Sequence, residues 1–338
     1  MKTLQSTHAV QFDIICHELL QRYAIAGLAI AMIENHQLAW IRCFGVQDAT
    51  TQAPINKDTV FEAASLSKPV VAYAALQLCE SKKLGLQDSL SSYLDYQFDS
   101  RVTVYHLLSH TSGLPNWLND DELPITHFTP GSRFSYSGVG YRVLQQAIEK
   151  ITGQSLATYL EQSVFKSFGM PNSSFVWQPR FTENSTVGHD KNGVPVDKFK
   201  PQKAYAAFSL HSSITDYAAF ITSSLNTPII EKMLEPQMAV NDTTPWKENW
   251  FRADITEFPK VHWGLGWGLE ETSQGDFFWQ WGDNGSFKAF VMVSRDNGQG
   301  FIAMTNSANG DLLWQDLTST LLGGTHPALH WLKLIQVE

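Results

Sequence analysis

The sequence predicts an α+β fold: one antiparallel sheet flanked by terminal helices, with a mostly helical domain inserted. Three observations lead to this prediction. Strand-like text occurs near both ends of the chain, helical periodicity occurs at both extremes, and residues 84–200 are helical segments broken by glycine and proline. Strands from both ends close most simply into one sheet. We therefore expect residues 1–83 and 205–338 to form an α/β domain and residues 84–204 a mostly helical domain.

The N-terminal third contains the first predicted elements. Residues 11–23 have helical periodicity, and a dense apolar run at 26–34 is followed by a second run at 37–44 after an Asn-His turn. This order predicts a helix that leads into a β-hairpin. The next apolar stretch, residues 69–79, predicts a helix that opens near Ser65.

The remaining elements are bounded by turn residues. A helix is expected over residues 144–151, where Gly153 ends it. Asp-Asn-Gly sequences at 283–285 and 296–298 mark turns between late strands. Those strands are predicted at 263–270, 277–281, 288–294 and 301–306, a long polar loop at 241–258, and the last helical segment at 311–322.

Composition and charge argue against several classes of partner. The chain has 338 residues and a net charge of −9, without a basic run, which argues against nucleic acid and anionic membrane partners. No apolar run has the length of a membrane span, and residues 1–11 lack the features of a signal peptide. The simplest expectation is a cytoplasmic protein, or a periplasmic one if an export signal has been removed. Three cysteines without a regular spacing predict free thiols.

Ser65-x-x-Lys68 is the motif with the clearest chemistry. On a helix, residues three apart share a face, so the lysine would lie one turn from the serine and could take its proton. A serine activated by a lysine is one way to build a nucleophile without histidine. The same spacing recurs at Ser163 and Lys166, where it is expected to be a helix surface before a Gly169 turn.

Three further segments carry weaker signals. Tyr136 lies in a Pro-Gly and Ser-Gly loop, where a tyrosine can exchange protons. The turn that begins at Trp281 could present backbone N–H groups to a ligand, as an oxyanion hole requires. His106 and His110 have a spacing seen in zinc sites, but no third ligand is evident, so we expect core or capping histidines and no metal.

Taken together, these motifs resemble the serine β-lactamase-like superfamily, in the branch of class C β-lactamases, DD-peptidases and family VIII carboxylesterases. The resemblance covers nearly the whole chain. The matching text is AGLAIA (26–31), TVFEAASLSK (59–68), HLLSHTSGLP (106–115), FSYSGVGY (134–141) and GLGWG (264–268). It implies a β-lactamase/transpeptidase-like fold, an active site at the junction of the two domains, and no cofactor.

The resemblance also implies residue roles. Ser65 would be the acylated nucleophile, Lys68 its proton acceptor, and Tyr136 the residue that moves protons to the leaving group and activates the deacylating water. The oxyanion hole would be formed by the backbone N–H groups of Ser65 and Asn284. Two such donors can stabilise a transition state by several kcal/mol.

The chain departs from the family pattern at two places. Gly138 stands where the family has an asparagine, and Trp281-Gly282-Asp283 stands where β-lactamases have Lys-Thr-Gly. The second change removes a cation that would receive a substrate carboxylate. Trp281 would offer an apolar wall instead, and an inward Asp283 would repel anions. Gly138, Trp281, Gly282 and Asp283 are therefore the predicted substrate-binding residues.

These features predict a serine hydrolase that works through an acyl-enzyme, with esters of neutral or apolar acyl groups as substrates. A weak class C-like β-lactamase or a D-amino-acid peptidase is the alternative within the fold, acting on β-lactams or amides. A catalytically inactive binding or scaffold homologue is the alternative of another class. The sequence leaves the oligomeric state open.

Overall fold

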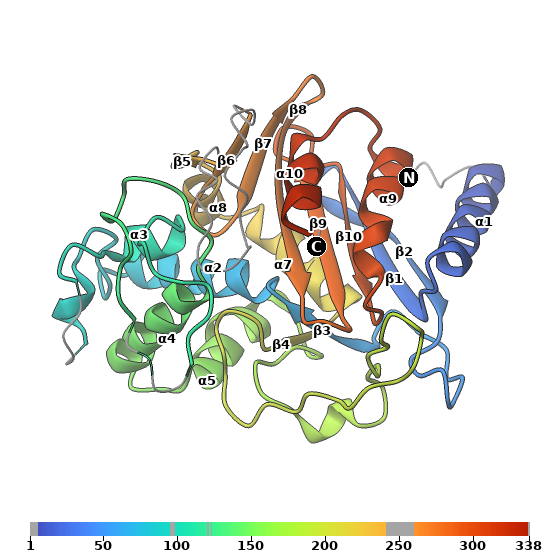
Figure 1. Cartoon of the computed structure of the whole chain (residues 1–338), viewed down its shortest axis with the longest axis horizontal. Helices are drawn as coiled ribbons and strands as arrows, with labels where there is room; N and C mark the ends of the chain where they lie inside the picture. The colour runs from blue at the N-terminus through green and yellow to red at the C-terminus, as the bar shows by residue number, and fades with distance from the viewer. Residues whose placement is uncertain (1–5, 95–98, 120–121, 123, 241–259, 337–338) are drawn as a thin grey trace.

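An eight-stranded antiparallel sheet forms the centre of the computed structural model, which describes residues 6–94, 99–119, 122, 124–240 and 260–336 (Figure 1). Its strand order is β2-β1-β10-β9-β8-β7-β6-β5. β1 (Gly27–Glu34) pairs with β2 (Gln37–Gly45) on one side and with β10 (Gly300–Thr305) on the other. Strands from the two ends of the chain are therefore neighbours, and this confirms the predicted α+β fold.

The other strands of the large sheet are β5 (Met238–Ala239), β6 (Val261–Trp263), β7 (Gly268–Thr272), β8 (Gly275–Asp283) and β9 (Lys288–Ser294). The α-helices are α1 (Ser6–Arg22), α2 (Ser67–Glu80), α3 (Val104–Leu108), α4 (Gly138–Thr152), α5 (Leu156–Leu160), α6 (Lys166–Phe168), α7 (Ile214–Ser224), α8 (Pro228–Met233), α9 (Leu313–Leu321) and α10 (Pro327–Gln336). Short 3₁₀ turns are η1 (Leu90–Ser92), η3 (Pro179–Phe181) and η4 (Gly310–Leu312), and η2 (Glu161–Phe165) is a π-helical turn.

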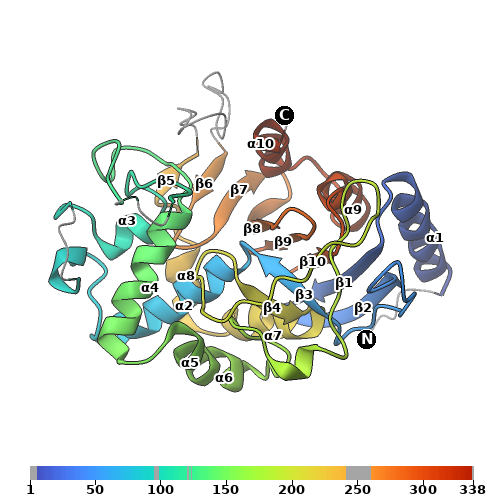
Figure 2. The ribbon, with the colours of Figure 1, turned by 60° about the horizontal axis from the view of Figure 1, so that its bottom comes forward.

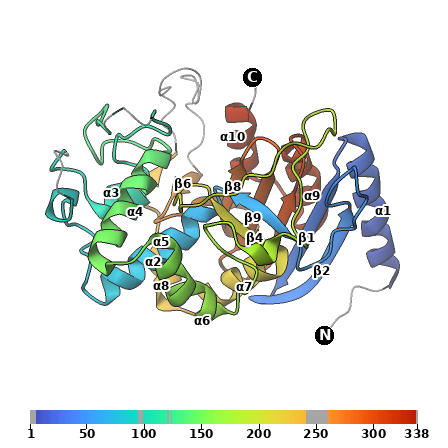
Figure 3. The same cartoon turned by 90° about the horizontal axis from the view of Figure 1, so that it is seen from below.

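Helices cover both faces of the sheet. Successive side chains of a strand point to opposite faces, and in β1 one set, including Leu28 and Ile30, packs with α1, α9 and α10. The alternate set, including Ala29 and Ala31, packs with α2 and α7. Figures 2 and 3 show these two helical layers on either side of the sheet. Burial on both faces explains why β1 is an almost unbroken apolar run.

Two glycines correct the prediction of a single strand over 263–270. β6 ends at Trp263 and β7 begins at Gly268, and between them the Gly264 N–H donates to the Trp267 carbonyl at 2.8 Å. Gly266 adopts a φ of +96°, which side chains rarely tolerate. The chain therefore folds back as a hairpin within the predicted strand.

Other elements were absent from the prediction, among them two short strands and the C-terminal helix. β3 (Val60–Ala64) and β4 (Leu210–Ser213) form a separate two-stranded antiparallel sheet. The segment 311–322 is not the last helix, because α10 follows it with Pro327 at its first position. The predicted loop at 241–258 lies outside the described residues.

The two-domain division remains a prediction. The described residues between 84 and 204 hold α3 to α6 and no strand of the large sheet, while residues 182–209 contain no helix. Cys16, Cys43 and Cys79 are free thiols, as expected. Within the described part of the chain, no helix combines the length and apolar character that a membrane span requires.

Candidate active site

A sharp strand-to-helix turn presents Ser65. β3 ends at Ala64, whose φ of +48° lies in the left-handed region that non-glycine residues seldom adopt. The Ser67 hydroxyl donates to the Ala64 carbonyl at 2.6 Å and accepts the Leu210 N–H at 3.0 Å, so β4 holds the turn. Ser65 is partly exposed at the start of α2 while its neighbours are buried. Backbone strain beside an accessible serine is typical of a functional position.

Lys68 lies against this serine. Its Nζ is 2.9 Å from Ser65 Oγ and 2.9 Å from the Ala207 carbonyl oxygen. The side chain is only 2% exposed, and burial without a carboxylate partner lowers the pKa of Lys68 to about 7. At neutral pH a substantial fraction of the amine is therefore unprotonated and able to accept a proton.

This pKa predicts the pH dependence of acylation. Protonated Lys68 has no free electron pair, so activity should be low at pH 5, rise through about pH 7 and be level above about pH 8. The measurement is kcat/KM for a neutral ester, whose own charge does not change over this range. A rate independent of pH between 5 and 8 would contradict Lys68 as the base.

Tyr136 closes the other side of the serine. Its hydroxyl lies beside the Ser65 side chain, and its ring lies 4.7 Å from Lys68 Nζ. The ring packs on His110 at 4.3 Å and on Trp281 at 4.6 Å between centroids. Burial raises the pKa of Tyr136, so the phenol stays protonated in the working range of the protein. The structure thus brings Ser65, Lys68 and Tyr136 together.

The end of β8 corrects the expected oxyanion donor. The Asn284 N–H donates to the Phe287 carbonyl at 3.0 Å and closes the hairpin turn, so it is not free for a ligand. The Asn284 side chain donates to Glu62 Oε2 at 2.8 Å, which ties the turn to β3. Asn284 therefore positions the turn and does not have the role that the sequence suggested.

Asp283 is the residue whose backbone faces the right way. Backbone groups along an antiparallel strand alternate between bonding the neighbouring strand and pointing away from it. The Asn284 N–H bonds toward β9, so the Asp283 N–H one residue earlier points away from β9. β7 does not occupy that side, because its pairing with β8 ends at Trp279. The Asp283 carboxylate pairs with Lys288 Nζ at 2.6 Å on the neighbouring strand. Lys288 compensates the negative charge that was expected to repel anionic substrates.

Gln280, and not Trp281, is the β8 side chain that faces Ser65 and Tyr136. Trp281 is 5% exposed and packs with Trp279 and Trp331 in the core on the α10 side of the sheet, so it is no open apolar wall. One residue earlier, Gln280 Nε2 lies 3.0 Å from the Tyr136 hydroxyl and 3.1 Å from the Ser65 carbonyl oxygen. The signal was a lone polar residue within the apolar run of β8. The motif position that holds a lysine in β-lactamases is therefore occupied by the neutral amide of Gln280, and not by Trp281.

Gly282 allows β8 to approach the serine. A Cβ at this position would lie 2.6 Å from the Ala63 carbonyl oxygen and 3.2 Å from the Ser65 nitrogen. Gly282→Ala should therefore push β8 away from Ser65, lower kcat/KM by about 10- to 100-fold and destabilise the fold by about 1–3 kcal/mol. Steady-state kinetics and thermal unfolding measure both effects, with Ser286→Ala in the same turn as the control. An unchanged kcat/KM would show that this contact is not needed.

A pocket of about 290 Å³ adjoins the reacting groups. Gly138 and Ala207 lie in its wall, and Trp117 and Phe208 contribute aromatic rings 5.8 Å apart. Asn116, which the sequence did not single out, accepts the Gly138 N–H at 2.8 Å. Arg142 and Lys203 also line the pocket. Ser65, Lys68 and Tyr136 do not line this pocket, and its link to them is Ala207, whose carbonyl oxygen accepts a hydrogen bond from Lys68 Nζ.

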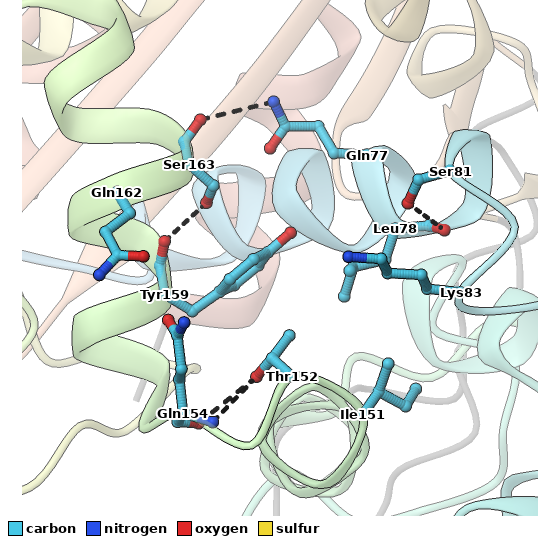
Figure 4. Close-up of a pocket in the computed structure, with 10 residues that line it drawn as sticks. All are labelled: Gln77, Leu78, Ser81, Lys83, Ile151, Thr152, Gln154, Tyr159, Gln162 and Ser163. Atoms are coloured by element: carbon cyan, nitrogen blue, oxygen red, sulfur yellow. Dashed lines mark hydrogen bonds between the residues drawn. The ribbon is translucent and has the colours of Figure 1, made fainter.

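A second hollow, of about 710 Å³, lies elsewhere (Figure 4). It is formed by the C-terminal part of α2, the end of α4 and the η2 turn, with Gln77 and Ser163 hydrogen-bonded across it at 3.5 Å. None of the three predicted catalytic residues lines it. Ser163 bonds the Tyr159 carbonyl within its own helix and Lys166 is exposed, so the second serine–lysine copy is helix surface, as expected.

The histidines have structural roles. His106 completes the capping box of α3 with Thr103, and the fully buried His110 accepts the Ser137 N–H at 3.0 Å. Burial and the nearby Lys68 charge lower the pKa of His110. Among the residues that the structure describes, no cluster of three His, Cys, Asp or Glu side chains could hold a metal ion.

Known proteins are similar to this chain in sequence or in fold. Protein flp of Staphylococcus aureus (strain MRSA252) is 26% identical over 326 residues, which cover 88% of this chain and 62% of that protein, so the chain spans less than two thirds of its length. A class C beta-lactamase superposes with a TM-score of 0.77 at 18% identity, covering 96% of this chain and 99% of its own. D-alanine carboxypeptidase AmpC from Burkholderia cenocepacia gives 0.72 at 21% identity, covering 86% and 91%.

The family assignment depends on the sequence match. The family model described as Beta-lactamase matches residues 12–318, from α1 to α9. That span includes the serine turn, the Tyr136 loop and the end of β8. The chain belongs to the beta-lactamase family.

Proposed function

We propose that this protein is a serine hydrolase that acts through an acyl-enzyme, and that it is a carboxylesterase for neutral or apolar acyl groups. The observation that carries the proposal is the 2.9 Å contact between Ser65 Oγ and a buried Lys68 amine whose pKa is lowered to about 7. The unprotonated amine takes the Ser65 proton as Oγ attacks the ester carbonyl. The alcohol then leaves with a proton, and water hydrolyses the acyl-enzyme.

Backbone donors stabilise the oxyanion in this proposal. The Ser65 N–H lies at the start of α2, where no side chain caps the helix, and the Asp283 N–H is directed away from β9. Gly282 keeps the two segments close. Two preorganised N–H donors supply several kcal/mol of transition-state stabilisation.

The preference for neutral substrates depends on the charges around Ser65. Gln280 is a neutral amide where β-lactamases of the family place a lysine, so nothing at that position forms an ion pair with a substrate carboxylate. Asp283 is already paired with Lys288. The pocket beside Ala207 offers the aromatic rings of Trp117 and Phe208 to an acyl group.

A weak β-lactamase or D-amino-acid peptidase activity is the second candidate. Arg142 and Lys203 line the same pocket, and two cations there favour a substrate with an anionic group. The names of the structural neighbours, a class C beta-lactamase and a D-alanine carboxypeptidase, point in the same direction.

Substrate turnover separates the candidates. We expect hydrolysis of short p-nitrophenyl esters and little or no turnover of a chromogenic cephalosporin or a D-alanyl-D-alanine peptide. Equal or better cephalosporin turnover would overturn the ester preference. Covalent labelling by a fluorophosphonate probe tests the remaining alternative, an inactive scaffold, because a folded protein without a Ser65 adduct would support it.

Tyr136→Phe removes the hydroxyl that reaches the Ser65 side chain but keeps the ring between His110 and Trp281. Turnover of an alkyl ester should fall by about 10²- to 10⁴-fold, as expected for a lost proton donor. The unfolding midpoint, measured by circular dichroism, should fall only moderately, because the ring packing is kept and one buried hydrogen bond from Gln280 is lost at a cost of about 1–3 kcal/mol. A near-normal rate would assign proton transfer to another group.

A further inference from the structure

Gln280 is a fully buried amide that joins two parts of the site. Its Nε2 lies 3.1 Å from the Ser65 carbonyl oxygen and 3.0 Å from the Tyr136 hydroxyl. Its Oε1 is buried and has no hydrogen-bond partner among the described residues. An unsatisfied buried oxygen is unfavourable, so a polar residue at this position calls for an explanation.

The two contacts fix the direction of hydrogen bonding. A carbonyl oxygen only accepts, so the group that faces the Ser65 carbonyl must be the NH₂ of Gln280. The same nitrogen reaches the Tyr136 hydroxyl, so its second N–H donates to the phenol oxygen. Because Gln280 donates to the phenol oxygen, the proton of Tyr136 is left to point away from Gln280, on the side where the Ser65 side chain lies.

We propose that Gln280 is a positioning residue that makes Tyr136 a proton donor toward Ser65 and the leaving group, and that leaves Lys68 as the base. The inference rests on the proposed function, and it adds which group donates a proton and which group accepts one during acyl transfer. Lys68 accepts the serine proton, and Tyr136 gives its own proton to the departing alkoxide. The phenolate is then reprotonated from the Lys68 ammonium, so the proton count balances.

The groups around Tyr136 agree with this direction. Lys68 approaches from α2 and His110 from the loop after α3, and Tyr141 of α4 packs on His110 close enough to interact electrostatically with Tyr136. His110 accepts the Ser137 N–H on Nδ1, and burial lowers its pKa, so it stays neutral. Burial raises the pKa of Tyr141, so it stays neutral as well. Of these neighbours, Lys68 is the one that changes charge near neutral pH.

Leaving-group dependence tests the role of Gln280 in turnover. p-Nitrophenolate departs without a proton at neutral pH, whereas an alkoxide requires one. Gln280→Met should therefore lower kcat/KM for p-nitrophenyl acetate by less than about 5-fold and for ethyl acetate by about 30-fold or more, with KM little changed. Equal losses on both esters would show a merely structural role and overturn the proposal. Gln47→Met, which changes a distant amide hydrogen-bonded to Pro54, is the matched control.

A second measurement does not depend on turnover or on the folding of the Gln280→Met variant. The protein is labelled with ¹³Cζ-tyrosine, and the NMR resonance of Tyr136 is assigned as the one missing from the Tyr136→Phe spectrum. The chemical shift of this resonance should not change with pH up to pH 11. Gln280→Lys, which places a cation beside the phenol, should bring that titration below pH 11. Titration of wild-type Tyr136 below pH 10 would overturn the proposal. An inactive wild type whose Tyr136 does not titrate would contradict the proposed function but keep the hydrogen-bond direction.

Discussion

Replacing Ser65 by alanine is expected to abolish ester hydrolysis. In the proposed mechanism the Oγ atom forms the covalent bond to the acyl group, and no other hydroxyl is hydrogen-bonded to Lys68 Nζ among the described residues. Loss of a serine nucleophile in an enzyme of this kind lowers kcat by about 10⁴- to 10⁶-fold. Steady-state hydrolysis of p-nitrophenyl esters, together with mass spectrometry of a fluorophosphonate-treated sample, measures the effect.

The fold should tolerate this change. Ser65 is partly exposed, and the turn around it is held by Ser67 and Leu210, not by Oγ. Ser163→Ala, in the second serine–lysine copy, is the matched control and should retain full activity, because the Ser163 hydroxyl bonds only the Tyr159 carbonyl and the backbone oxygen that accepts from Gln77 is kept. Appreciable hydrolysis by a clean Ser65→Ala preparation would refute the nucleophile assignment.

The sequence could predict the closure of the sheet because the signal is local. Apolar runs and turn residues mark β1, β2, β8, β9 and β10, and strands from both ends have one simple way to pair. β3 and β4 escaped prediction because each is short and pairs over a separation of about 150 residues. Pairing at that distance is decided by tertiary contacts, which a single sequence does not display.

The candidate site shows the same division. Ser65 and Lys68 are three residues apart on one helix turn, so spacing alone is enough to bring them together. At the end of β8, a shift of one residue turns the opposite face toward the serine. The alignment of motifs assigned Trp281 and Asn284, while the backbone pairing points to Gln280 and Asp283. Asn116 was missed because its contact with Gly138 joins a loop to the first residue of α4, 22 positions later in the sequence.

Lys68→Met is expected to have the second largest effect. Methionine fits a site that is 2% exposed and removes an amine whose burial is unfavourable, so stability should be kept or increased. Without a base for the Ser65 proton, kcat/KM should fall by about 10²- to 10⁴-fold, and the rise in activity through pH 7 should disappear. Kinetics between pH 5 and pH 9 measure both effects, and Lys166→Met is the exposed control.

Lys68→Arg separates a base from a fixed positive charge. A guanidinium keeps its proton at every pH the protein tolerates, so it can hold a charge beside Ser65 but cannot accept the serine proton. If Lys68 works by proton transfer, the arginine variant should be as inactive as the methionine variant and show no limb near pH 7. If it retained most of the activity, Lys68 would act through its charge, and the low pKa that burial gives it would have no part in catalysis.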